Sequence, residues 1–108
     1  MLQVSYTRIR EDAIPRVRDW LGSLRSREAE LRELARAQTI SDELAHLISG
    51  EDGPVLVYAI VVDDLGAARE AIQKGSLPIA REWRALMSEC SAGHPAHEVL
   101  LDRGAEHP

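Results

Sequence analysis

Short apolar segments bounded by turn residues predict four β-strands. In the first, residues 2–7, apolar and polar side chains alternate, which is typical of a strand with one drier face. We expect further strands at residues 41–49, 55–62 and 97–103. Residues 50–54 contain the turn formers Gly, Asp and Pro, so the second and third strands should form a hairpin.

Between the strands, apolar residues recur every three or four positions, which predicts amphipathic helices. The first helix should span residues 13–37 without interruption. A second follows an N-cap at Asp63 or Asp64 and ends at Gly75, where a left-handed C-cap residue is expected. A third begins at Pro78, because proline is favoured in a first helical turn.

This order of elements predicts one α+β domain over residues 1–108 with a ferredoxin-like βαββαβ fold. Four strands would form a single antiparallel sheet, with all helices on one face. The other face would then meet water, and such strands normally alternate apolar with polar residues.

The predicted strand at residues 55–62 does not alternate. Both of its faces are apolar: Val55, Val57, Ala59 and Val61 lie on one, and Leu56, Tyr58, Ile60 and Val62 on the other. Since the helices cover only one face, we expect a second copy of the chain to cover the other through a two-fold axis, giving a homodimer. The alternative is that loops or the C-terminal tail fold over that face.

Composition indicates which kinds of partner and which cellular compartment to expect. The net charge of −5 disfavours a nucleic-acid partner, because phosphates would be repelled. The longest apolar run, residues 54–62, is much shorter than the roughly 20 residues of a membrane span, and no signal peptide is recognisable. The single cysteine, Cys90, cannot form an internal disulfide, so we expect a reducing, cytoplasmic location.

Scattered residues between Val4 and Cys90 carry a family resemblance: Thr7-Arg8-Ile9, Arg16 to Trp20, Glu28, Leu56-Val57-Tyr58, Asp64-Leu65, Ser76, Pro78-Ile79 and Glu89-Cys90. In these the chain resembles short bacterial proteins of the domain-of-unknown-function family 6176, related in fold to the dimeric α+β-barrel superfamily. The resemblance implies the fold and its dimer, but no activity. Family members often have Asp and His where this chain has Ala80 and Trp83.

Two polar residues on predicted apolar faces are candidate site residues. Glu28 falls in the apolar stripe of the first predicted helix, where a buried carboxylate could act as a general acid or base. Alternatively the helix turns there, and Glu28 pairs with Arg25 or Arg32 at the surface. His46 lies between Leu44 and Ile48, as a proton shuttle or as a structural or interface histidine.

Two aromatic residues complete the candidate set. Tyr58 in the third strand could hydrogen-bond a ligand or fill the dimer interface. Trp83, together with Trp20, could line a pocket for a flat apolar molecule or simply fill the core. Cys90, His94 and His97 do not make a convincing metal site, and no cofactor motif is present.

Two hypotheses of function follow from these residues. The first is a small-molecule binding protein or cofactor-independent enzyme, with a cleft between sheet and helices that contains Glu28, His46, Tyr58 and Trp83. The second is a non-catalytic homodimeric module for assembly or regulation. Whether the protein is an enzyme stays open.

Overall fold

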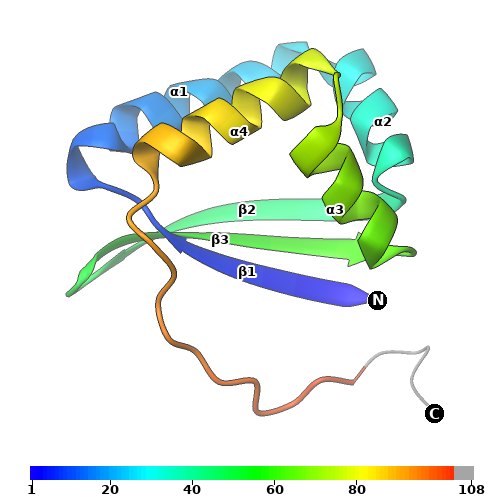
Figure 1. Cartoon of the computed structure of the whole chain (residues 1–108). Coiled ribbons are helices and arrows are strands. Elements are labelled where there is room, and N and C mark those ends of the chain that lie inside the picture. The colour runs from blue at the N-terminus through cyan, green and yellow to red at the C-terminus, as the bar shows by residue number, and fades with distance from the viewer. Residues whose placement is uncertain (104–108) are drawn as a thin grey trace.

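The computed structural model describes residues 1–103 and has an α+β architecture (Figure 1). One antiparallel sheet with the strand order β1-β3-β2 is formed by β1 (Leu2–Arg8), β2 (Ile40–Gly50) and β3 (Gly53–Val62). The helices are α1 (Ile14–Ser23), α2 (Glu28–Ala37), α3 (Leu65–Lys74) and α4 (Pro78–Cys90), with short 3-10 turns at Glu11–Ala13 and Leu24–Ser26. All four α-helices lie on one side of the sheet (Figure 1).

The strand register defines which side chains share a face. Tyr58 of β3 lies opposite Ser5 of β1 and Ala45 of β2. The inner face, towards the helices, comprises Gln3, Ser5, Thr7, Glu43, Ala45, Leu47, Leu56, Tyr58, Ile60 and Val62. The outer face comprises Leu2, Val4, Tyr6, Arg8, Asp42, Leu44, His46, Ile48, Val55, Val57, Ala59 and Val61.

The hairpin between β2 and β3 is confirmed, and the two strands pair from Gly50 and Gly53 onward. Gly53 has a φ of 105°, a conformation that glycine adopts without steric cost. At the end of α3, the prediction of a left-handed Gly75 is wrong, because its φ is −63°. Glycine is required there for space, since a Cβ atom would lie 2.1 Å from the Ala71 carbonyl oxygen.

The prediction of one helix over residues 13–37 is also wrong. The chain leaves helical geometry at Arg27, which has φ −120° and ψ 41°, and α2 begins at the next residue. Just before it, the Ser23 hydroxyl donates to the Trp20 carbonyl oxygen at 2.6 Å, and that of Ser26 to the Ser23 carbonyl oxygen at 2.8 Å. Such local side-chain bonds to the backbone compete with regular helix and bend it.

The predicted fourth strand at residues 97–103 does not form, so within residues 1–103 the sheet has three strands where four were expected. Between α4 and residue 97, Ser91 forms a β-bridge to Ile9, and Ala92 and Gly93 bond the backbone of Arg8. The apolar residues of the segment, Val99 to Leu101, are consecutive and do not alternate, so no single face would be apolar.

Two clusters of buried side chains hold the layers together. One joins β3 to α1 and α4 through Leu56, Val17 and Leu86. The other lies between the helices, around Leu34 and Ile79. Within residues 1–103, no helix is both long and apolar enough to cross a membrane.

Candidate functional site

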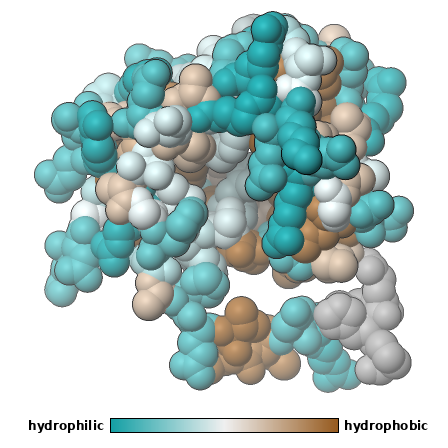
Figure 2. All heavy atoms as spheres, in the orientation of Figure 1, coloured by the Kyte–Doolittle hydropathy of each residue, from teal (hydrophilic) through white to brown (hydrophobic). Residues whose placement is uncertain are grey.

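The helices cover the two ends of the inner face but leave its middle open. Along β3, Leu56 and Val62 are buried, at 2% and 1% exposure, whereas Tyr58 between them is only half-buried. Its neighbours on the adjacent strands, Ser5 and Ala45, are exposed. We call this part of the inner face, around Tyr58, the central recess. Figure 2 shows a pale hollow at the centre of the molecule, between the helix layer and the sheet.

The polar centre of the central recess is a hydrogen bond between two strands. The phenol of Tyr58 donates to Oε2 of Glu43, which lies on β2 diagonally across from it. Burial raises the pKa of Tyr58 above its ordinary value, and the carboxylate beside it raises this pKa further. The phenol therefore stays protonated at neutral pH and acts as a hydrogen-bond donor.

Aromatic rings form the helix side of the central recess. The rings of Tyr58 and Trp83 have centroids 5.9 Å apart, and those of Trp83 and Trp20 are 5.8 Å apart. The interplanar angles are 36° and 41°, within the tilted arrangements that aromatic pairs favour. A flat apolar surface thus lies next to a phenol and a carboxylate.

A charged network fixes the far end of this aromatic series. The Trp20 indole N–H donates to Glu82 Oε1 at 3.0 Å, and Arg27 donates to both oxygens of Glu82 at 2.7 and 2.8 Å. Arg27 also bonds both oxygens of Glu30. The Arg27 guanidinium, and after it the Trp20 indole, lower the pKa of Glu82 to about 2. The network ties the helix break at Arg27 to α4.

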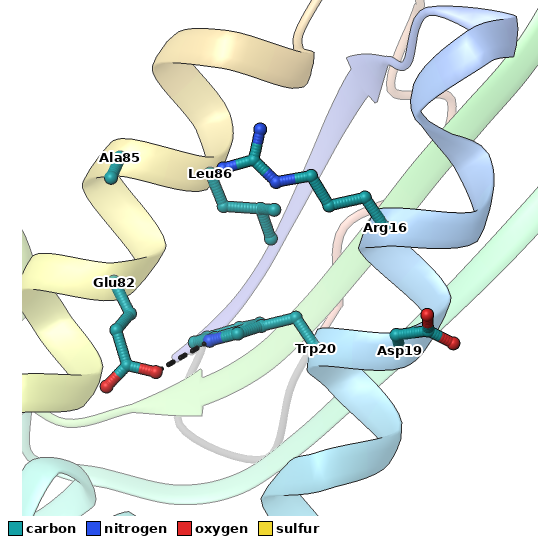
Figure 3. A pocket seen from close by; sticks show the side chains of 6 residues that line it. All are labelled: Arg16, Asp19, Trp20, Glu82, Ala85 and Leu86. Atoms are coloured by element: carbon teal, nitrogen blue, oxygen red, sulfur yellow. Dashed lines mark hydrogen bonds between the residues drawn. The ribbon is translucent and has the colours of Figure 1, made fainter.

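Beyond Trp20, a groove of about 610 Å³ opens between α1 and α4. Figure 3 shows Trp20 on its floor with Glu82 beside the indole N–H. Most of its polar groups are engaged, because Glu82 binds Arg27 and Trp20, and Arg16 pairs with Glu89. The central recess is the better candidate, since its phenol and carboxylate converge beside an apolar wall.

Of the four residues singled out from the sequence, the structure brings two together. Tyr58 and Trp83 meet in the central recess. Glu28 is the first residue of α2 and forms an exposed ion pair with Arg32 at 2.8 Å, so its expected place in an apolar stripe is wrong and the surface alternative is confirmed. His46 lies on the outer face and is exposed.

Glu43 was not among the residues singled out from the sequence. The signal was available in the alternation of β2: Glu43, Ala45 and Leu47 share a face, and the hairpin places that face beside Tyr58. A carboxylate on the helix-facing side of a strand can accept a hydrogen bond from a donor on the neighbouring strand. Tyr58 supplies one.

The residues weighed as metal ligands lie at the end of α4 and in the chain that follows it. Cys90 is buried, His94 Nδ1 lies 2.8 Å from the Tyr6 carbonyl oxygen, and His97 stacks on the Tyr6 ring. Within residues 1–103, no three His, Cys, Asp or Glu side chains are grouped as metal ligands would be.

The fold and the central recess define an α+β protein with a helix-covered sheet and an aromatic site between the two layers. The chain belongs to the family of unknown function DUF6176, whose model matches residues 2–106. The resemblance to this family in the sequence is therefore confirmed. No curated protein and no solved structure matches the chain.

Proposed function

We propose that this protein binds a flat small molecule in the central recess. The observation that carries the proposal is the Tyr58–Glu43 pair, held beside the Trp83 ring of α4 in the half-buried middle of the inner face. An interior that served packing alone would place apolar side chains here, as it does at Leu56. A recess with an apolar wall and a few convergent polar groups is the usual form of a ligand site.

The polar pair defines the chemistry of the ligand. The protonated phenol of Tyr58 can donate to a carbonyl or hydroxyl oxygen, and Glu43 can accept from a hydroxyl group. The ring of Trp83 suits a planar, mostly apolar body. A planar molecule with one phenolic or enolisable oxygen meets all three requirements.

The same pair supports a cofactor-independent enzyme as a second candidate. Glu43 can take a proton from a carbon next to a ligand carbonyl, while Tyr58 donates a hydrogen bond to the oxygen that gains negative charge. The proton then returns from Glu43 to another carbon of the ligand, so the reaction is an isomerisation that needs no oxidant. Two groups with these roles already lie within hydrogen-bond reach of each other.

Tryptophan fluorescence and thermal unfolding test binding directly. Both tryptophans, Trp20 and Trp83, belong to the aromatic series, so a bound planar probe such as 2-naphthol should change their emission. At 100 times its dissociation constant a ligand stabilises a protein by about 2.7 kcal/mol, which raises the melting temperature. Tyr58→Phe and Glu43→Gln should each weaken the response about tenfold.

Glu28→Gln is the matched control, because it neutralises an exposed carboxylate outside the central recess. It should bind the probe as the unmodified protein does. If a panel of planar phenols and ketones changes neither fluorescence nor melting temperature, the proposal fails, and a non-catalytic assembly module becomes the better reading.

We also propose that the partner of this protein is a second copy packed on the outer face. That face exposes Leu2, Val4, Leu44 and Ile48, at 57, 39, 57 and 50%. Four large apolar side chains on one open sheet face form the kind of patch that marks an interface. The observed order β1, α1, α2, β2, β3, α3, α4 follows that of a ferredoxin-like fold up to its last strand, with a pair of helices at each helical position, which supports a place in the dimeric α+β-barrel superfamily.

Light scattering at micromolar concentration tests the dimer. The expected mass is about 24 kDa, twice the 12.0 kDa of the chain. A mass of 12.0 kDa would contradict the dimer without affecting the ligand site.

The buried free thiol of Cys90 supports a cytoplasmic, reducing location for this assembly.

A further inference from the structure

After α4 the chain passes around the edge of β1 to the outer side of the sheet. The Arg8 N–H donates to the Gly93 carbonyl oxygen at 2.7 Å, and His94 Nδ1 lies 2.8 Å from the Tyr6 carbonyl oxygen. His97 then stacks on the ring of Tyr6, an outer-face residue, at a centroid distance of 4.5 Å. From there the segment runs below the sheet, on the side away from the helices (Figure 1).

This C-terminal segment, residues 97–103, carries three consecutive large apolar side chains in the open. Val99, Leu100 and Leu101 are 69, 85 and 81% exposed. They form the brown cluster at the bottom of Figure 2, outside the body of the molecule. Large side chains exposed to this degree lose most of the free energy that burial would supply, so the segment is poised to contact another surface.

The strand β2 also exposes large apolar side chains on its outer face. It pairs with β3 on one side, and its other edge has no strand partner within residues 1–103. Its outward apolar residues Leu44 and Ile48 are 57 and 50% exposed. An open edge of 11 residues is a ready template for another chain, and natural proteins rarely leave one uncovered.

We propose that residues 97–103 of one copy lie along β2 of a second copy, with Val99 to Leu101 covering Leu44 and Ile48. This rests on the proposed dimer. Seven extended residues span about 23 Å. Facing sheets lie about 10 Å apart, so a segment held at its own β1 has the length to reach the sheet packed against it. Its own β2 lies on the far side of β3, across the outer face that the partner would occupy.

Two variants that each carry one added cysteine, mixed after separate purification, test this exchange. One carries Leu101→Cys, and the other carries Leu44→Cys or Ile48→Cys. Under mild oxidation we expect a disulfide-linked product of about twice the 12.0 kDa chain mass. The native Cys90 is buried, at 1% exposure, so the unmodified protein gives the background.

Leu2→Cys is the matched control. Leu2 lies on the same outer face and is 57% exposed, as Leu44 is, but belongs to β1 at the opposite edge of the sheet. Cross-linking of Leu101→Cys to Leu2→Cys in preference to Leu44→Cys would overturn the assignment to β2. A second test uses one chain that carries both Leu101→Cys and Leu44→Cys. If the two cysteines form a disulfide within that chain, at monomer mass, the segment folds back on its own sheet.

The double variant Leu100→Ser, Leu101→Ser gives a second readout. It should raise the dimer dissociation constant about 100-fold in sedimentation experiments, because two leucines per chain lose their burial. A dimer of unchanged affinity whose residues 97–103 are cut rapidly by protease would overturn the exchange while leaving the proposed dimer intact. A monomer in the unmodified protein would overturn both.

Discussion

On β1, the side chains that point towards the helices are Gln3, Ser5 and Thr7, whereas Leu2, Val4 and Tyr6 point away from them. On β2 both faces are mixed: Glu43 points inward with Ala45 and Leu47, and Leu44 and Ile48 point outward with Asp42 and His46. At β1 the sheet is thus more polar on its covered face than on its open face.

This inversion on β1 bears on the contacts proposed above for each face. An antiparallel sheet that met helices on one side and water on the other would have an apolar inner face and a polar outer face. Here the inner face combines a packed end at Leu56 with polar groups around Tyr58, as a ligand site requires. The outer face has the composition of a protein interface. Substitutions on one face at a time separate the two roles.

The largest effect on folding should come from the packed end of the inner face. Leu56→Ala removes a side chain that is 2% exposed and packs against both Val17 and Leu86. We expect the free energy of unfolding in urea to fall by about 3 kcal/mol, from lost burial and the cavity left behind. Leu44→Ala, on the outer face, should cost less than about 1 kcal/mol at concentrations where the chain is monomeric. Equal losses would remove the distinction between the faces.

Adjacent residues on β2 allow the two faces to be perturbed one at a time. Leu44→Glu places a charge on the outer face and should raise the dimer dissociation constant roughly thirtyfold, about 2 kcal/mol. Ala45→Glu places the same charge one residue later, on the inner face beside Tyr58. It should leave the dimer intact and reduce binding of a planar probe. Dissociation by both variants would show that the charge acts through β2 stability and not through either face.

Much of this contrast could be predicted from the sequence, because it depends on period-two alternation. The apolar character of β3 on both faces and the hairpin with β2 were visible in residues 50–62. The alternation of β2 also places Glu43 on the face beside Tyr58, but which residue of that face bonds the phenol, 15 residues away in the chain, depends on the exact hairpin register. The helix break at Arg27 was missed because the apolar spacing continues through it, while Ser23 and Ser26 bond the backbone locally.

A smaller, pH-dependent effect should come from Glu82, which supports the inner face from behind Trp20. Its folded pKa of about 2 lies below the ordinary value of 4.5. This contribution to stability is therefore complete above pH 4.5 and is lost as pH falls towards 2. The carboxylate is 39% exposed, so solvent screening limits the contribution to about 1 kcal/mol.

Urea unfolding measured from pH 6 to pH 2.5 checks the role of Glu82. Glu82→Gln should be less stable than the unmodified protein at pH 6 and should lose less stability on acidification. Glu28→Gln removes an exposed carboxylate of the pair with Arg32 and serves as control, with the acid dependence of the unmodified protein. Parallel pH profiles of unfolding free energy for the unmodified protein and Glu82→Gln would contradict the proposed contribution of Glu82 to acid-sensitive stability.

The smallest effect on stability at neutral pH should come from Tyr58→Phe. Glu43 is exposed and keeps its hydration when the phenol is removed, so the loss should be below about 1 kcal/mol. The pKa of Tyr58 is raised above the ordinary value of 10.0, mainly by burial, so the folded state resists loss of this proton. Its contribution is complete below pH 10 and decreases as pH rises further, because only the unfolded chain ionises readily there.

Unfolding of the two proteins at pH 7 and pH 11 separates a ligand-binding phenol from a packing residue. The unmodified protein should lose more stability than Tyr58→Phe between these pH values, while Tyr58→Phe at pH 7 keeps its fold and binds a planar probe more weakly. A Phe variant that binds the probe as well as the unmodified protein would leave Tyr58 a packing residue of the inner face. The polar groups of the central recess would then require another explanation.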